Sequence, residues 1–106
     1  MRGLAITSAR RSASYPELPT VAESGVPNFE VTPFSGMVAP AGVSKTIVNR
    51  LNAEVNKALS TSAVKEKFDV LGNVPAGGTP EEFAAHIKRE VIKWTAVIKN
   101  AGIKAD

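Results

Sequence analysis

The stretch Phe29-Glu-Val-Thr-Pro-Phe-Ser-Gly-Met-Val-Ala-Pro-Ala-Gly42 joins two parts of the chain that differ in character. Apolar residues alternate at its start and a short apolar run lies near its end, which predicts extended backbone. Pro33 and Gly36 interrupt it and favour an edge strand, a bulge or a crossing between lobes. Its last four residues, Ala-Pro-Ala-Gly, form a turn before a helix. Such a junction can bind an anion or small ligand, or it can simply support the fold.

The remaining sequence predicts an α/β fold with few short strands. We expect strands at about residues 2–8 and 29–39, where apolar runs or alternation occur. Three main helices are expected at about residues 45–60, 63–71 and 80–101, where apolar residues recur every three or four positions.

Local signals mark the ends of these helices. Ser44 is a good N-cap for the first helix, and Thr61 lies in a Ser-Thr-Ser break that caps the second. Thr79, Pro80 and Glu82 have the spacing of a capping box with proline at the first helical position. Trp94 lies in the apolar stripe of the third helix, so we expect it to be buried against other helices.

Composition excludes several classes of function. The chain has 106 residues, of which 43% are hydrophobic, with a net charge of +3 and no cysteine. Its charges alternate in sign over the predicted helices, which indicates a solvated surface rather than a nucleic-acid interface. His86 is the one histidine, so we expect no metal site, and no cofactor motif occurs. Since no nucleophile motif or acid–base pair is present either, we expect no enzyme activity.

Two small hydroxyl residues, Thr7 and Ser8, follow the first predicted strand. They are placed either to line a ligand cleft or to cap the turn that follows. Arg10 and Arg11 come next; they could hold an anion or be exposed loop residues.

Five motifs occur in an order that resembles one family of proteins. They are Arg2-Gly-Leu-Ala-Ile-Thr-Ser8, Glu17-Leu-Pro-Thr-Val-Ala-Glu23, Ala39-Pro-Ala-Gly42, Leu51-Asn-Ala-Glu-Val-Asn56 and Gly77-Gly-Thr-Pro-Glu-Glu-Phe83. Together they resemble the carboxy-terminal part of the Bug/TctC family, the extracytoplasmic solute receptors of tripartite tricarboxylate transporters. The resemblance extends over essentially the whole chain.

The resemblance implies a type II periplasmic-binding-protein-like fold, with a small carboxylate or acidic amino acid held between two lobes. Residues 1–106 would then be a single carboxy-terminal segment, with the amino-terminal lobe absent. Partners would be the ligand and the membrane components of the transporter, and the location would be periplasmic. We expect the ligand contacts of this segment to come from a small set of residues. They are Thr7, Ser8, Thr32, Phe34, Ser35 and Gly36.

Two features leave an alternative open. Where the family tends to have Ser-Trp-Tyr-Gly, this chain has Pro33-Phe-Ser-Gly36, and so lacks a hydroxyl-bearing ring. A segment without its second lobe would also leave apolar faces uncovered. The alternative is therefore a truncated chain that binds no ligand and acts as a structural module by forming a homo-oligomer.

Overall fold

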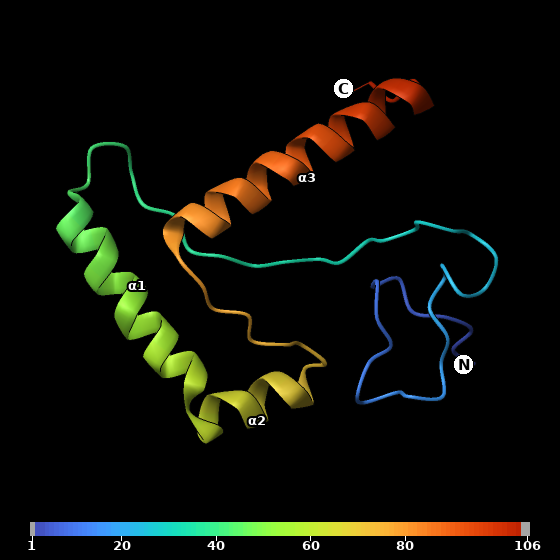
Figure 1. The fold of residues 1–106 in the computed structure, drawn as a ribbon, viewed down its shortest axis with the longest axis horizontal. Coiled ribbons are helices and arrows are strands. Elements are labelled where there is room, and N and C mark those ends of the chain that lie inside the picture. Colours follow the sequence, from blue (N-terminus) through green and yellow to red (C-terminus); the bar gives the residue numbers. More distant parts are fainter. Residues whose placement is uncertain (1, 105–106) are drawn as a thin grey trace. The chain divides into compact units, whose positions relative to one another are not determined.

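Three helices form where the sequence places apolar stripes between capping residues. The computed structural model describes residues 2–104, and its helices are α1 (Lys45–Ser60), α2 (Ser62–Val70) and α3 (Pro80–Ala101) (Figure 1). These bounds confirm the three helices expected from the sequence. None of the three is long and apolar enough to cross a membrane.

The ends of α1 and α3 follow from their capping residues. The Ser44 hydroxyl accepts a hydrogen bond from the N–H of Ile47 at 3.4 Å and begins α1. At α3 the Thr79 hydroxyl accepts from the N–H of Glu82 at 3.1 Å, and the Glu82 carboxylate accepts from the N–H of Thr79 at 2.8 Å. This capping box satisfies two amide groups that a helix start leaves without partners.

The start of α2 differs from the expectation. Thr61 is its N-cap residue, but the Thr61 side chain makes no cap hydrogen bond. Its hydroxyl instead donates to the carbonyl oxygen of Ala58 at 2.7 Å, in the last turn of α1. The Thr61 side chain therefore caps the end of α1 and not the start of α2.

The chain divides into two units, Met1–Val38 and Ala39–Asp106, and the helices lie in the second. In the first unit the centre is Thr20, which is 2% exposed and is the one buried residue among those described. Ile6 and Thr20 form an isolated parallel bridge. Short backbone pairings, rather than a sheet, therefore organise residues 2–38.

The two expected strands, at 2–8 and 29–39, are not confirmed. Among residues 2–104, backbone pairing at the first is limited to Ile6 and Thr7, and at the second to Phe29 and Val31. A strand needs a neighbouring backbone along its length, and the described part of the chain offers none there. The stretch from 29 to 40 is extended chain without a ladder.

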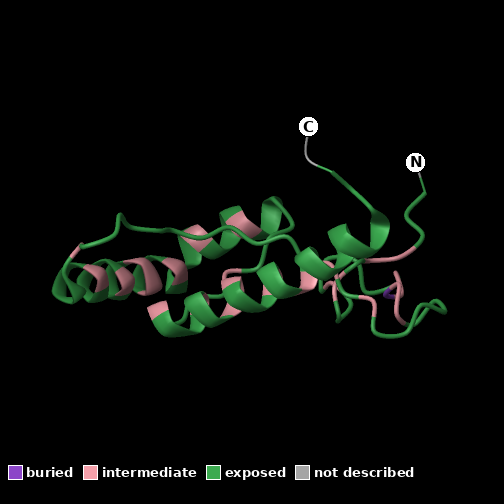
Figure 2. Ribbon diagram, turned by 90° about the horizontal axis from the view of Figure 1, so that it is seen from above, coloured by how far each residue is buried: buried purple, intermediate pink, exposed green. Residues whose placement is uncertain are grey.

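Burial in the helical unit is incomplete. No residue of α1, α2 or α3 is buried, and half-buried positions are scattered along largely exposed helices (Figure 2). Trp94 is 40% exposed, so the expectation that it is buried was wrong. In its apolar stripe Phe83 and Ile87 are half-buried, whereas Val91 and Ile98 beside it are exposed. The Trp94 indole N–H donates to Oε2 of Glu90 at 2.9 Å.

Candidate functional site

Residues Ile6 and Thr7 lie between two other segments of the first unit. On one side the N–H of Ile6 donates to the Pro19 carbonyl at 2.9 Å, and the N–H of Val21 donates to the Ile6 carbonyl at 2.8 Å. On the other side the N–H of Val31 donates to the Thr7 carbonyl at 2.9 Å. This last bond brings the start of the segment that carries residues 32–36 next to Thr7.

The hydroxyl groups of Thr7 and Ser8 have different surroundings. Ser8 is half-buried, and its hydroxyl donates to the carbonyl oxygen of Arg10 at 2.7 Å. This is the turn-capping role that the sequence left open. Thr7 is exposed, and no hydrogen bond to its hydroxyl is formed within residues 2–104. Of this pair, Thr7 has the hydroxyl proton available to an anionic ligand.

The second group of site residues is extended and accessible. Thr32, Ser35 and Gly36 are exposed, and Phe34 is 48% exposed. Pro33 has no N–H, so donors in this segment come from the hydroxyls and the amides that follow it. The arrangement offers neutral donors, of the kind that hold a carboxylate without a paired cation.

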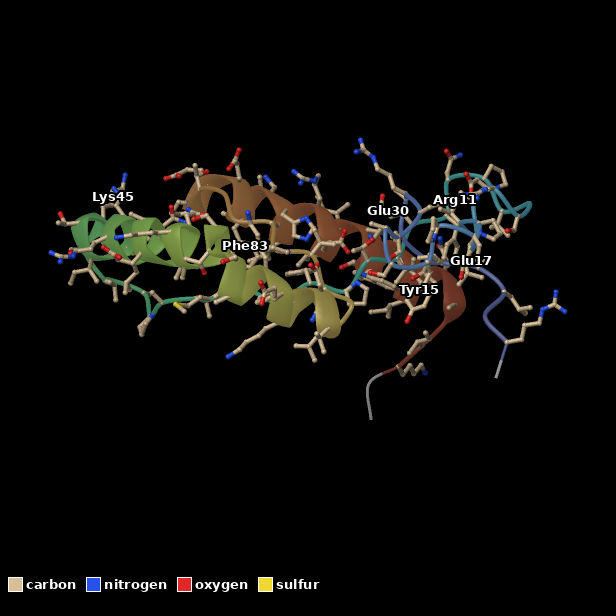
Figure 3. The ribbon with its side chains drawn as sticks, turned by 90° about the horizontal axis from the view of Figure 1, so that it is seen from below. Arg11, Tyr15, Glu17, Glu30, Lys45 and Phe83 are labelled. Atoms are coloured by element: carbon tan, nitrogen blue, oxygen red, sulfur yellow. The ribbon has the colours of Figure 1, made fainter. Side chains whose placement is uncertain are left out.

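A network of hydrogen bonds in the first unit positions the turn at residues 20–24. Thr20 and Glu23 form a capping box, with the N–H of Thr20 donating to Glu23 Oε2 at 2.8 Å and the Thr20 hydroxyl accepting from the N–H of Glu23 at 3.1 Å. Arg11 (Figure 3) donates from Nε to the same Oε2 at 3.0 Å and from a terminal nitrogen to the Pro16 carbonyl at 3.3 Å. These contacts fix the chain that pairs with Ile6.

The same network assigns roles to the two arginines. The N–H of Thr20, and then the guanidinium of Arg11, hold the pKa of the Glu23 carboxyl below its ordinary value. Arg11 is thus engaged within the protein, while Arg10 is exposed beside Ser8. The Thr-x-x-Glu spacing of Thr20 and Glu23 predicts this capping box from the sequence, and the structure confirms it. Nothing in the sequence pairs Arg11 with Glu23.

Other parts of the molecule offer weaker candidates. A hollow at the end of α2 is lined by Glu66, Lys67, Val70 and Leu71, and it includes no predicted site residue. Within residues 2–104, no three acidic or histidine side chains are grouped to hold a metal ion. The ligand site therefore stays a prediction, made for the residues named from the sequence in the first unit.

Comparison with solved structures identifies the class of protein to which this fold belongs. The structure resembles that of R. palustris Rpa4515 with adipate (36% identity, TM-score 0.82), which matches 93% of this chain and 33% of that one. It also resembles the periplasmic binding protein BugD (34% identity, TM-score 0.81), over 96% of this chain and 35% of that one. The fold is that of part of a periplasmic binding protein.

The family follows from sequence. The family model described as tripartite tricarboxylate transporter family receptor, TctC, matches residues 1–103, and the chain belongs to this family. It is 41% identical to the UPF0065 protein in the tcbD-tcbE intergenic region of Pseudomonas sp. strain P51, over 100% of this chain. It is 38% identical to protein BugT of Bordetella pertussis, over 98% of this chain. The chain spans 32% of the length of each of these two relatives.

Proposed function

We propose that this chain forms one side of the ligand site of a periplasmic receptor that captures a small carboxylate for uptake. The observation that carries the proposal is the likeness of nearly the whole chain to part of Rpa4515, a protein whose structure was solved with adipate. Membership of a transporter receptor family supports the same role and the membrane components of such a transporter as partners. In this proposal the protein binds its ligand without transforming it.

The local geometry supports a carboxylate as ligand. The Val31–Thr7 hydrogen bond supports this, because Thr7, whose hydroxyl is exposed, lies beside the residue that precedes Thr32. Hydroxyl and amide donors suit carboxylate oxygens, and the exposed guanidinium of Arg10 adds positive potential nearby. Each neutral hydrogen bond contributes about 0.5–1.5 kcal/mol net, so the site depends on donors from a second lobe as well.

A chimera tests this function. The chain replaces the corresponding third of Rpa4515, and binding of adipate, succinate, citrate and glutamate is measured by thermal shift and calorimetry. We expect at least one of these carboxylates to bind. Thr7→Val and Ser35→Ala should each weaken binding by about threefold to tenfold, because each removes one hydrogen bond.

The control variant is Thr95→Val, which makes the same change as Thr7→Val on an exposed position of α3. It should leave binding unchanged. A chimera that melts cooperatively but binds none of the carboxylates would contradict the proposed function. Binding that is unaffected by both site variants would leave the function standing but would place the site elsewhere.

A second candidate function is self-association as a structural module. Among residues 2–104 no hydrophobic side chain is buried, and the second half of α3 exposes a stripe of apolar residues. They are Val91, Trp94, Val97 and Ile98. Contiguous apolar surface on a soluble protein is usually covered by a partner. Sedimentation of the 106-residue chain would reveal a concentration-dependent dimer, whereas a monomer at all concentrations would exclude this candidate.

A further inference from the structure

Two asparagines of α1 hold the turn from which α3 begins. The side-chain amide of Asn56 pairs with both backbone groups of Gly78: its Nδ2 donates to the Gly78 carbonyl at 2.8 Å, and its Oδ1 accepts from the Gly78 N–H at 2.9 Å. Asn52 Nδ2 donates to the same carbonyl at 2.9 Å. Asn56 Nδ2 also donates to Asn52 Oδ1 at 3.1 Å, which orients the two amides together.

The Asn56 side chain binds Gly78 in the way that a neighbouring strand would bind its backbone. In an antiparallel ladder, a residue exchanges an N–H and a carbonyl with its partner, and here one amide makes both contacts. The residue after Gly78 is Thr79, the N-cap whose capping box starts α3. The bonds to Gly78 therefore act directly on the start of α3.

Gly77 leaves the space that the cluster needs. Its φ is +67°, a left-handed conformation that disfavours any residue with a side chain. A Cβ placed there would lie 2.6 Å from Oδ1 of Asn56, well inside the contact distance. The Asn56 side chain can thus reach the turn because residue 77 has no side chain.

Apolar packing between α1 and α3 is limited, because neither helix contains a buried residue. Asn52 and Asn56 are half-buried, to the same degree as apolar residues such as Val55 and Phe83. We propose that Asn52, Asn56 and Gly78 form a polar latch, the asparagine latch, which sets the position of α3 relative to α1. The proposal concerns the helical unit and does not depend on the ligand proposed above.

Hydrogen exchange at Gly78 tests the latch directly. The Gly78 amide lies outside the helices, so without the latch it would exchange at the rate of an exposed loop amide. We expect it to be protected in the unmodified chain and to lose that protection in Asn56→Ala. Asn52→Ala keeps both contacts between Asn56 and Gly78, and should accelerate exchange by about threefold to tenfold.

Energy transfer measures the helix position itself. Trp94 is the single tryptophan and the chain has no cysteine, so Arg50→Cys provides one labelling site on α1. We expect Asn56→Ala to broaden the distribution of distances from Trp94 to that label while helical content is retained. Asn49→Ala is the matched control, because it removes an exposed asparagine of the same helix that makes no bond to Gly78.

If the Asn56→Ala variant loses its helices, alanine substitutions at two glycines provide a second test. Gly72 has φ +68° and open space around its Cβ position, whereas Gly77 has φ +67° and the Asn56 contact. Both changes to alanine strain the backbone alike, so Gly77→Ala should lower the unfolding midpoint further than Gly72→Ala. Asn52→Ala should reduce this difference because it loosens Asn56.

Three results would overturn the proposal. They are unprotected exchange of Gly78 in the unmodified chain, an unchanged distance distribution in a helical Asn56→Ala variant, and equal unfolding midpoints for Gly72→Ala and Gly77→Ala. Any one of them would mean that the position of α3 is set by other contacts.

Discussion

Thr79 fixes the start of α3 through its reciprocal hydrogen bonds with Glu82. Thr79→Ala removes the hydroxyl that accepts from the Glu82 N–H and leaves that amide without an intramolecular partner. We expect the free energy of unfolding to fall by about 1 kcal/mol, the usual effect of losing an N-cap side chain. Denaturant unfolding followed by helical circular dichroism measures it.

Thr95→Ala is the matched control for this prediction. Thr95 lies within α3 on an exposed position, where alanine is the better helix former, so this variant should be equally stable or slightly more stable. If Thr79→Ala has the same unfolding midpoint as Thr95→Ala, the hydroxyl of Thr79 does not cap the helix.

Glu90 joins Lys93 and Trp94 on the surface of α3. Its Oε1 accepts from Lys93 Nζ at 2.7 Å, and its Oε2 accepts from the Trp94 indole N–H at 2.9 Å. The ammonium of Lys93, and then the indole N–H, lower the pKa of Glu90 from its ordinary value of 4.5. Since the folded pKa is the lower one, the stabilisation is present above pH 4.5 and is lost as pH falls through the folded pKa.

Trp94 fluorescence reports this titration, because the chain has no other tryptophan. We expect the emission to change on acidification with a midpoint below 4.5, and Glu90→Gln to abolish the change. Glu23→Gln should preserve it, although Glu23 also has a lowered pKa. A midpoint at or above 4.5, or a transition that survives in Glu90→Gln, would show that the Glu90–Trp94 bond is absent in solution.

At the scale of the elements, the helices were predictable because their signals are local. Ser44 and Thr79 lie within a few residues of the amides that they cap, so a pattern in the sequence is enough to locate the ends of α1 and α3. Burial of a helix face depends on residues that are distant in the sequence, which a local pattern does not reveal. The prediction that Trp94 is buried was wrong for this reason. Amphipathicity predicts which face of a helix is apolar, but it does not identify a surface that packs against that face.

The strands and the site were less predictable for the same reason. Alternation predicted extended chain near Val31, but a strand also requires a neighbouring backbone that sequence spacing does not identify. The residue types at Thr7 and Thr32 indicated hydroxyl donors, whereas the Val31–Thr7 bond that brings their segments together appears in the structure alone. The contact of Arg11 with Glu23 likewise joins residues that no local pattern links.

Exchange of single amides tests that juxtaposition. Within the extended stretch from 29 to 40, the Val31 N–H bonds to Thr7, and the amides of Thr32 and Ser35 have no bond to another described residue. We expect the Val31 amide to exchange more slowly than those of Thr32 and Ser35. Equal rates at the three positions would mean that the two groups of site residues are not held together.

At the level of the whole molecule, the proposed function relies on more than the residues of this chain. It spans about a third of the relatives and solved structures that it matches. The proposed site residues are few and neutral, and two or three hydrogen bonds of about 0.5–1.5 kcal/mol each scarcely reach the ~4 kcal/mol that millimolar binding needs. A carboxylate should therefore bind usefully when a second lobe supplies further donors and excludes water.

The need for a second lobe is tested by calorimetric titration of the 106-residue chain beside the Rpa4515 chimera, both with adipate and the other carboxylates. We expect the chimera to bind, and the monomeric chain alone to bind no tighter than about millimolar. Micromolar binding by the monomeric chain would contradict this, because the whole site would then lie within these residues. Absence of binding by a folded chimera would equally contradict it, because residues 7–8 and 32–36 would then form no part of a carboxylate site.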